Sequence, residues 1–406
     1  MWLGIALLVV ASASGAWGFP QDQQKAAYAP AEYGAYQAAA REEHPQNRVK
    51  ALDDFVAKYP MSALLPNVYR DYYIAYYPQK NYMKTIEYAD KELALGEKVD
   101  IEKRLEAYIA RAQAFFAGQA DKSLQTPETL AKTRDAAAEG LETLASWQKP
   151  ERMSDEQFAM QKKSVGVLFN SIAGIANSQL KDYKSAEASY RAALALDPND
   201  AVTHSRLGLV YLQETPPQAP DGFWELSRSI ALRGPHEAQE RTYLRSQLLQ
   251  YQQLSCEKLG DDEINELVTL AASSGNRPAT LSIPSANDLQ KTRDDTDNFL
   301  PWLQEGGDHG KTMWLATCGL TYPDVAIRVM EITPSSGDNL TLQVFRAPTR
   351  EAMQAATAPN MEVHVVGQPE AKRIQKDEFV RFTGTLSTYQ QRPFVLTWDN
   401  AKVNIR

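Results

Sequence analysis

The chain has 406 residues, of which 43% are hydrophobic and 23% are charged. Its 43 lysines and arginines against 51 aspartates and glutamates give a formal net charge of −8. This acidic balance argues against a nucleic-acid-binding protein, since the phosphate backbone attracts an excess of basic residues. The composition also excludes collagen-like, low-complexity and wholly disordered chains, and the length predicts more than one structural region.

An apolar stretch opens the chain, with LGIALLVVA at 3–11 followed by the small residues of SASGAWG. This length suits the core of a signal peptide and is too short to span a bilayer. No Lys or Arg precedes Lys25, so the usual positive segment is missing, and a buried N-terminal helix is the alternative. We predict a signal peptide at 1–18, no integral membrane span, and a soluble exported protein of the periplasm or the extracellular space.

The strongest pattern is a repeat at 167–200, where two amphipathic segments flank a polar break. Small and bulky residues alternate where two antiparallel helices would have to meet closely: Gly174, Ala186, Tyr190, Ala193 and Pro198. This pattern resembles the tetratricopeptide repeat, in which Gly, Ala, an aromatic residue, Ala and Pro recur at these offsets within about 34 residues. The resemblance implies a pair of helices that stacks on neighbouring pairs.

The repeat continues on both sides. Residues 201–235 form a second unit, marked by Leu207, Gly208 and Tyr211. A weaker unit covers 66–99. Further helix pairs are predicted at 100–118 with 125–147, and at 236–257 with 263–273. The segment ALDDFVAKYPMS resembles a repeat variant of exported bacterial assembly lipoproteins. We therefore predict a tetratricopeptide α-solenoid over 33–275.

Solenoids of this type present an extended concave surface, which implies a protein or peptide partner. The first helices would offer these residues to it: Arg70, Tyr73, Tyr77, Ser171, Ser178, Arg206 and Gln213. A place in the core is the alternative for the tyrosines. Some family members clamp a C-terminal carboxylate with Lys and Asn, but here those positions hold Leu168, Ser171, Ile175, Val202, Ser205 and Leu209. The resemblance therefore implies no such clamp, although Arg206 could contribute to one.

The last hundred residues change to a period of two, which predicts strands. A linker at 275–285 and helices up to residue 320 precede them. Strands are predicted at 325–332, 340–345, 361–366, 378–386 and 394–405, with a short helix at 348–357. The segment from Lys376 to Val403 resembles the closing strands of bacterial OB-like domains, which implies a small all-β barrel at 321–406. A β-sandwich or an SH3-like barrel is the alternative.

The chain contains two cysteines, Cys256 and Cys318. In an oxidising compartment a disulfide between them would close a loop of about 60 residues and stabilise the fold by roughly 4 kcal/mol in the chain-entropy model. Two separate buried thiols are the alternative.

The sequence offers little for catalysis. GGDHGKT at 306–312 lacks the first glycine of a phosphate-binding loop, and the histidines are too scattered for a metal site. We predict no enzyme, cofactor or metal, and expect a protein-interaction scaffold of the cell envelope. Two alternatives remain. One is an enzyme or small-ligand site near His309, Cys318 or Asp399 in the β domain; the other makes the β domain the recognition head and the helices a spacer.

Overall fold

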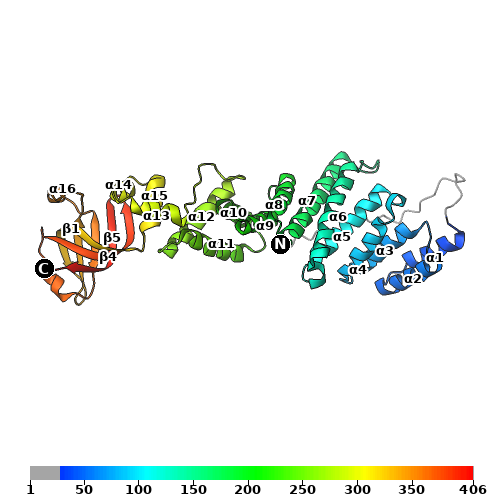
Figure 1. Cartoon of the computed structure of the whole chain (residues 1–406), viewed down its shortest axis with the longest axis horizontal. Coiled ribbons are helices and arrows are strands. Elements are labelled where there is room, and N and C mark those ends of the chain that lie inside the picture. Colours follow the sequence, from blue (N-terminus) through cyan, green and yellow to red (C-terminus); the bar gives the residue numbers. More distant parts are fainter. Residues whose placement is uncertain (1–27, 406) are drawn as a thin grey trace. The chain divides into compact units, whose positions relative to one another are not determined.

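The computed structural model describes residues 28–405, and the predicted signal peptide lies outside them (Figure 1). Contacts between Cα atoms divide the chain into two compact units, one ending at Glu240 and the other beginning at Arg241. This division falls inside a helix, α11, Glu237–Gln252, and the linker predicted at 275–285 lies within the second unit. The two units are described separately below.

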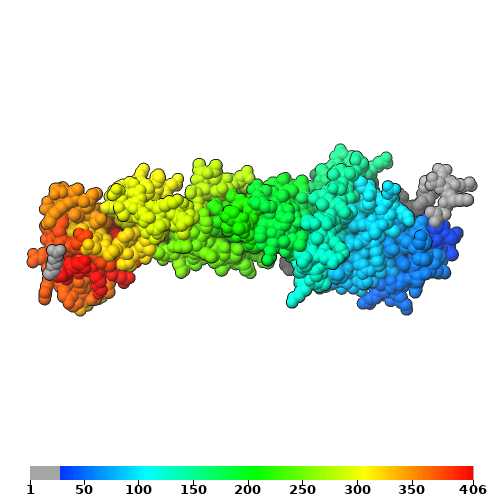
Figure 2. Space-filling model, viewed as in Figure 1, coloured from blue at the N-terminus to red at the C-terminus, as the bar shows by residue number. Residues whose placement is uncertain are grey.

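The first unit is a series of antiparallel helix pairs in which each helix packs against the next. The first helices of successive pairs are also in contact, with α1 against α3, α3 against α5 and α5 against α7. In Figure 2 the colours of this unit follow the sequence from blue to green, since every pair stacks on its neighbour. The helices are α1 Pro30–Ala40, α2 Pro45–Lys58, α3 Leu65–Tyr76, α4 Tyr82–Leu93, α5 Ile101–Ala117, α6 Pro127–Ser146, α7 Asp155–Gln179, α8 Tyr183–Leu196, α9 Ala201–Gln213 and α10 Ala219–Ala231, with short 3₁₀ turns at Gly96–Lys98 and Lys122–Gln125.

Polar caps explain where these helices begin. The side chain just before the helix accepts a hydrogen bond from a backbone N–H of the first turn, which satisfies a donor that has no partner within the helix. Six helices of this unit start in this way, at Asn81, Asp100, Thr126, Ser154, Asp182 and Asp200. Ser154 and Gln157 form a reciprocal capping box, so α7 begins well before residue 167, where the repeat pattern starts.

The predicted repeat residues form the contacts expected of them. A Cβ atom on Gly174 would lie 2.5 Å from the ring of Tyr190, so only glycine allows α7 and α8 to meet there. A Cβ atom on Gly208 would similarly lie 3.0 Å from the carbonyl oxygen of Gly222 on α10. The remaining repeat residues on these helices are buried: Ala186, Ala193, Leu207 and Tyr211. The predicted α-solenoid of stacked antiparallel helix pairs is thereby confirmed in this unit.

The second unit begins with helices joined by a disulfide. Cys256, just before α12, is bonded to Cys318 at the end of α15, which is one of the two alternatives that the sequence left open. Gly307 and Lys311, from the segment with phosphate-loop resemblance, belong to α15. The helices are α12 Glu257–Ser273, α13 Ala286–Asp294, α14 Phe299–Glu305 and α15 Gly307–Thr317.

The strands close into a small barrel in the order β1-β2-β3-β5-β4, with β4 pairing back to β1. All these pairs are antiparallel except β3 with β5, which is the arrangement of an OB-like barrel. Alternate side chains such as Phe382, Leu386 and Trp398 fill the interior. The elements are β1 Thr321–Pro334, β2 Leu340–Phe345, α16 Arg350–Ala355, β3 Met361–Val365, a 3₁₀ turn at Pro369–Arg373, β4 Phe379–Gln391 and β5 Phe394–Asn404.

Candidate functional site

The first unit carries a groove of about 740 Å³, which is lined mainly by the first helix of each helix pair. Helices α3, α5, α7 and α9 supply most of its lining, and the segments between α6 and α7 and between α8 and α9 supply most of the remainder. On α5 the lining residues recur every three or four positions along one face of the helix, which is the spacing that brings side chains together. These residues are Glu102, Leu105, Glu106, Ile109, Ala110, Gln113 and Phe116.

The lining is largely apolar and partly open to solvent. Phe116 on α5 is 41% exposed and Met160 on α7 is 60% exposed, although both are large hydrophobic residues. Ile109 and Leu168 also line the groove and are half-buried. A concave apolar surface left uncovered in this way is typical of a binding site.

Three ion pairs neutralise most of the cations of the groove. Arg70 Nε lies 2.7 Å from a carboxylate oxygen of Glu106 and joins α3 to α5. Burial opposes the charged form of Arg70, but Glu106 outweighs it, so the pKa of Arg70 is raised. The pairs of Arg152 with Glu102 and of Lys163 with Asp197 are both 3.3 Å long.

Arg206 on α9 differs from these cations. Among the described residues, 28–405, none forms an ion pair or a hydrogen bond with its guanidinium, which lies 5.4 Å from the ring centroid of Phe116. The carboxylate nearest in sequence, Asp200, instead accepts hydrogen bonds from the backbone N–H of Val202 and the hydroxyl of Thr203. Burial lowers the pKa of Arg206, although Tyr190 and Asp200 oppose the change. The groove thus holds a partly desolvated positive charge without a carboxylate partner.

A buried acid lies behind the groove. Glu92 on α4 is 0% exposed, and burial raises its pKa to about 8, although the hydroxyl of Tyr73 beside it opposes the change. Tyr73 itself is buried and lines the groove, and burial together with Glu92 raises the pKa of its hydroxyl. Glu92 is therefore protonated in the folded chain at a pH where an exposed glutamate is ionised.

Replacing Glu92 by glutamine is expected to stabilise the chain increasingly as the pH rises. The pKa of Glu92 is about 8 in the folded state and 4.5 for an ordinary glutamate. The contribution of Glu92 to the free energy of unfolding of the wild type is therefore highest below pH 4.5 and falls as the pH rises through 8. Glu92→Gln and the wild type should therefore unfold at similar temperatures near pH 4.5 and diverge by several degrees at alkaline pH. Thermal unfolding across this range measures the effect, and a constant difference would contradict it.

Five of the seven predicted partner-binding residues line the groove, namely Arg70, Tyr73, Tyr77, Ser171 and Arg206. Ser178 and Gln213 are not among its lining residues, because they lie in the last turns of α7 and α9. On those helices the groove follows 160–172 and 202–206. Sequence reasoning missed Phe116 and Met160, and the only signal for Phe116 was the apolar face of 101–117.

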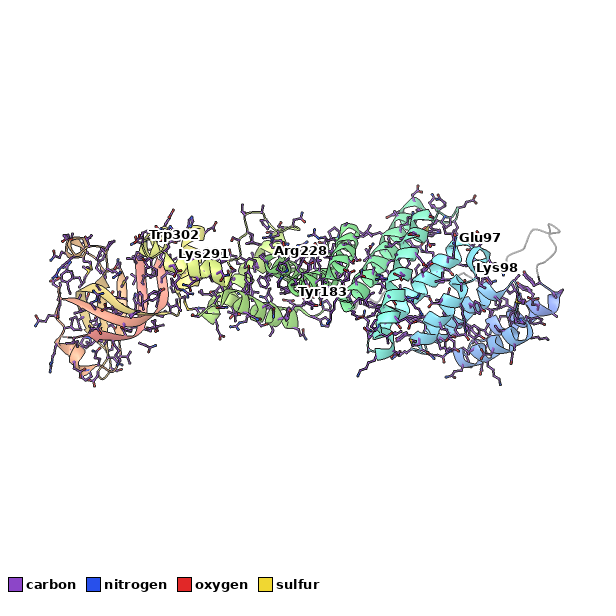
Figure 3. The ribbon with its side chains drawn as sticks, in the orientation of Figure 1. Glu97, Lys98, Tyr183, Arg228, Lys291 and Trp302 are labelled. Carbon is purple, nitrogen blue, oxygen red and sulfur yellow. A yellow bond between two sulfur atoms is a disulfide. The ribbon has the colours of Figure 1, made fainter. Side chains whose placement is uncertain are left out.

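The groups proposed for a catalytic site in the second unit have other partners. Cys318 is in the disulfide and has no free thiol. His309 stacks on Trp302 of α14, labelled in Figure 3, with ring centroids 4.9 Å apart. Asp399 accepts a hydrogen bond from His364, whose other ring nitrogen meets Glu362. Burial lowers the pKa of His364, but these two carboxylates outweigh it and the net pKa is raised.

The described part of the chain offers neither a metal site nor a membrane-spanning helix. Within residues 28–405, no group of three or more His, Cys, Asp and Glu side chains is arranged to hold a metal ion. None of the helices in this range is both long enough and apolar enough to cross a membrane.

Comparison with known proteins gives structural similarity alone, since no family model and no curated protein matches the sequence. A tetratricopeptide protein of Thermus thermophilus is 14% identical over 54% of this chain and 99% of its own, with a TM-score of 0.30. The C-terminal part of a tetratricopeptide-containing protein of Cytophaga hutchinsonii is 13% identical over 61% of this chain and 99% of its own, with a TM-score of 0.26.

Proposed function

We propose that the chain is a protein-interaction scaffold of the cell envelope that binds a peptide or protein partner in the groove of its helical unit. The observation that carries the proposal is the apolar lining of that groove, which leaves Phe116 and Met160 open to solvent. Exposed apolar surface of this size, edged by ion pairs, suits a protein partner better than a nucleic acid, and the net charge of −8 supports the same choice.

The proposed location in the periplasm or outside the cell rests on two features. The apolar stretch at 3–11 has the length of a signal-peptide core. The disulfide between Cys256 and Cys318 is a bond that persists in oxidising compartments and is rare in the cytosol.

Site-specific photocrosslinking in the cells that make the protein tests the proposal. A photoreactive residue such as p-benzoylphenylalanine is placed at Met160, in the groove, or at Met61, which is 88% exposed and does not line the groove. We expect one discrete adduct from Met160 and none from Met61, and mass spectrometry then identifies the crosslinked protein.

A third position separates the groove from the barrel. Val366 is an exposed apolar residue of the second unit and outside the groove lining. Adducts from Val366 with none from Met160 would contradict the proposal and favour the barrel as the recognition head. Loss of the Met160 adduct in an Ile109→Glu background, with the fold intact, would support the groove.

A further inference from the structure

Among the cations that line the groove, Arg206 stands apart. Arg70, Arg152 and Lys163 each have a carboxylate within 3.3 Å, whereas Arg206 has none among the described residues. Its guanidinium is half-buried and lies over the exposed ring of Phe116. We infer that the partner presents an aspartate or glutamate side chain to Arg206, with an apolar or aromatic residue beside it that covers Phe116. This inference rests on the proposed function.

The chemistry of the guanidinium favours a carboxylate. Its planar fork of N–H donors matches the two oxygens of a carboxylate, and such charge-assisted bonds are about twice as strong as neutral ones. A phosphate carries more negative charge and is usually held by a cluster of arginines. Here the neighbouring cations Arg70 and Lys163 are already paired, which leaves one positive charge for one negative charge.

The lining of the groove beyond Arg206 favours a side chain over a chain end. Val202 lies one turn earlier on α9 and also lines the groove, so a bound segment has surface to contact past the guanidinium. A chain that ended at Arg206 would leave Val202 uncovered. The cation–π contact of the guanidinium with Phe116 also restrains the fork before binding, which reduces the entropy lost on association.

Selection from a library of random peptides displayed on phage provides the probe. The library is selected on the full exported chain, and retained peptides are checked for loss of binding to Met160→Glu, which places a charge in the groove. We expect enrichment of Asp or Glu next to an aromatic or aliphatic residue. A recovered peptide is then synthesised in three forms. The first keeps its Asp or Glu, the second has Asn or Gln in that position, and the third keeps the acid but has an amidated C-terminus.

The expected result is a thermodynamic coupling between the peptide acid and Arg206. Arg206→Gln should weaken the acidic peptide at least about tenfold, and acid-to-amide replacement in the peptide should weaken it similarly. The two changes together should cost little more than either one alone. Arg206→Lys, which keeps the charge and loses the fork, should give an intermediate loss. Arg191→Gln is the matched control, because Arg191 pairs with Glu187 and does not line the groove.

Each of the other outcomes overturns either the inference about Arg206 alone or the proposed function as well. Peptides that depend on Met160 but are neutral, or are indifferent to Arg206→Gln, overturn this inference and leave the proposed function standing. If amidation of the peptide's C-terminus lowers its affinity as much as is expected from the acid-to-amide replacement of the side chain, the carboxylate at Arg206 belongs to a chain end instead. Peptides that are insensitive to Met160→Glu, or no retained peptide at all, count against the proposed function and this inference together. Thermal unfolding of Arg206→Gln should show no loss of stability, which separates binding from folding.

Discussion

Replacing Tyr190 by alanine is expected to lower the free energy of unfolding of the helical unit by about 3–5 kcal/mol, the range for large aromatic residues removed from a core. Tyr190 is 2% exposed, and its ring fills the space between α7 and α8 that Gly174 leaves open. Urea unfolding followed by far-UV circular dichroism measures the loss, because most helix of the chain lies in this unit. Tyr190→Phe, which keeps the ring, is the control and should cost much less.

Gly174 tests the same contact from the other helix. Gly174→Ala places a methyl group against the ring and should cost about 1–3 kcal/mol by overpacking. Gly34 on α1 has nothing within 4 Å of its would-be Cβ, so Gly34→Ala should stabilise the chain by up to about 1 kcal/mol. In the double variant of Gly174→Ala with Tyr190→Ala the new methyl group enters the cavity that the ring leaves. The loss of stability of the double variant should therefore be smaller than the sum of the losses of the two single variants. Equal effects at the two glycines would contradict this packing.

The pairing of α7 with α8 could be predicted because it depends on short-range spacing. Gly174 and Tyr190 lie in one repeat, and the need for a small residue opposite a large one is visible in the sequence itself. The strands of the barrel were predictable for a similar reason, since residues such as Phe382 and Trp398 alternate with polar neighbours. The order of the strands was not predicted, because pairing between strands depends on contacts distant in the sequence, and the OB-like barrel itself rested on a resemblance.

The groove was predicted only in part. Arg70, Tyr73 and Arg206 line it as expected, because the first helices of successive repeats share one face. Ser178 and Gln213 do not line it, since the rule takes no account of how far along each helix the groove extends, and their contact with a partner stays a prediction. Phe116 and Met160 were missed because a helical period identifies an apolar face without showing whether another helix covers it.

The unpaired state of Arg206 could not be predicted from the sequence either. Asp200 lies six residues earlier and could in principle pair with it, but its oxygens are used by Val202 and Thr203 at the start of α9. Whether a half-buried arginine such as Arg206 is paired depends on such competing bonds, which follow from three-dimensional geometry.

Removing the disulfide is expected to have the largest effect on the second unit. The bond joins residues 62 positions apart, and a loop of that size corresponds to about 4 kcal/mol in the chain-entropy model. The double variant Cys256→Ala with Cys318→Ala should lose stability of this order in the unit from Arg241 onward. Trp147 and Trp224 of the first unit are buried as well as Trp398, so amide hydrogen exchange of the barrel strands at increasing urea, read by mass spectrometry, measures the loss in this unit.

The wild type under a reducing agent is the matched control for this variant and should lose nearly the same stability. An unchanged unfolding midpoint on reduction would contradict a stabilising bond. The bond also bears on the proposed location, because a cytosolic protein would keep the two thiols reduced. Thiol titration of the denatured, unreduced protein taken from its own cells should therefore find none. Two titratable thiols would show that the disulfide does not form in these cells. The proposed export would then rest on the apolar stretch at 3–11 alone, whereas the proposed binding of a partner in the groove would be unaffected.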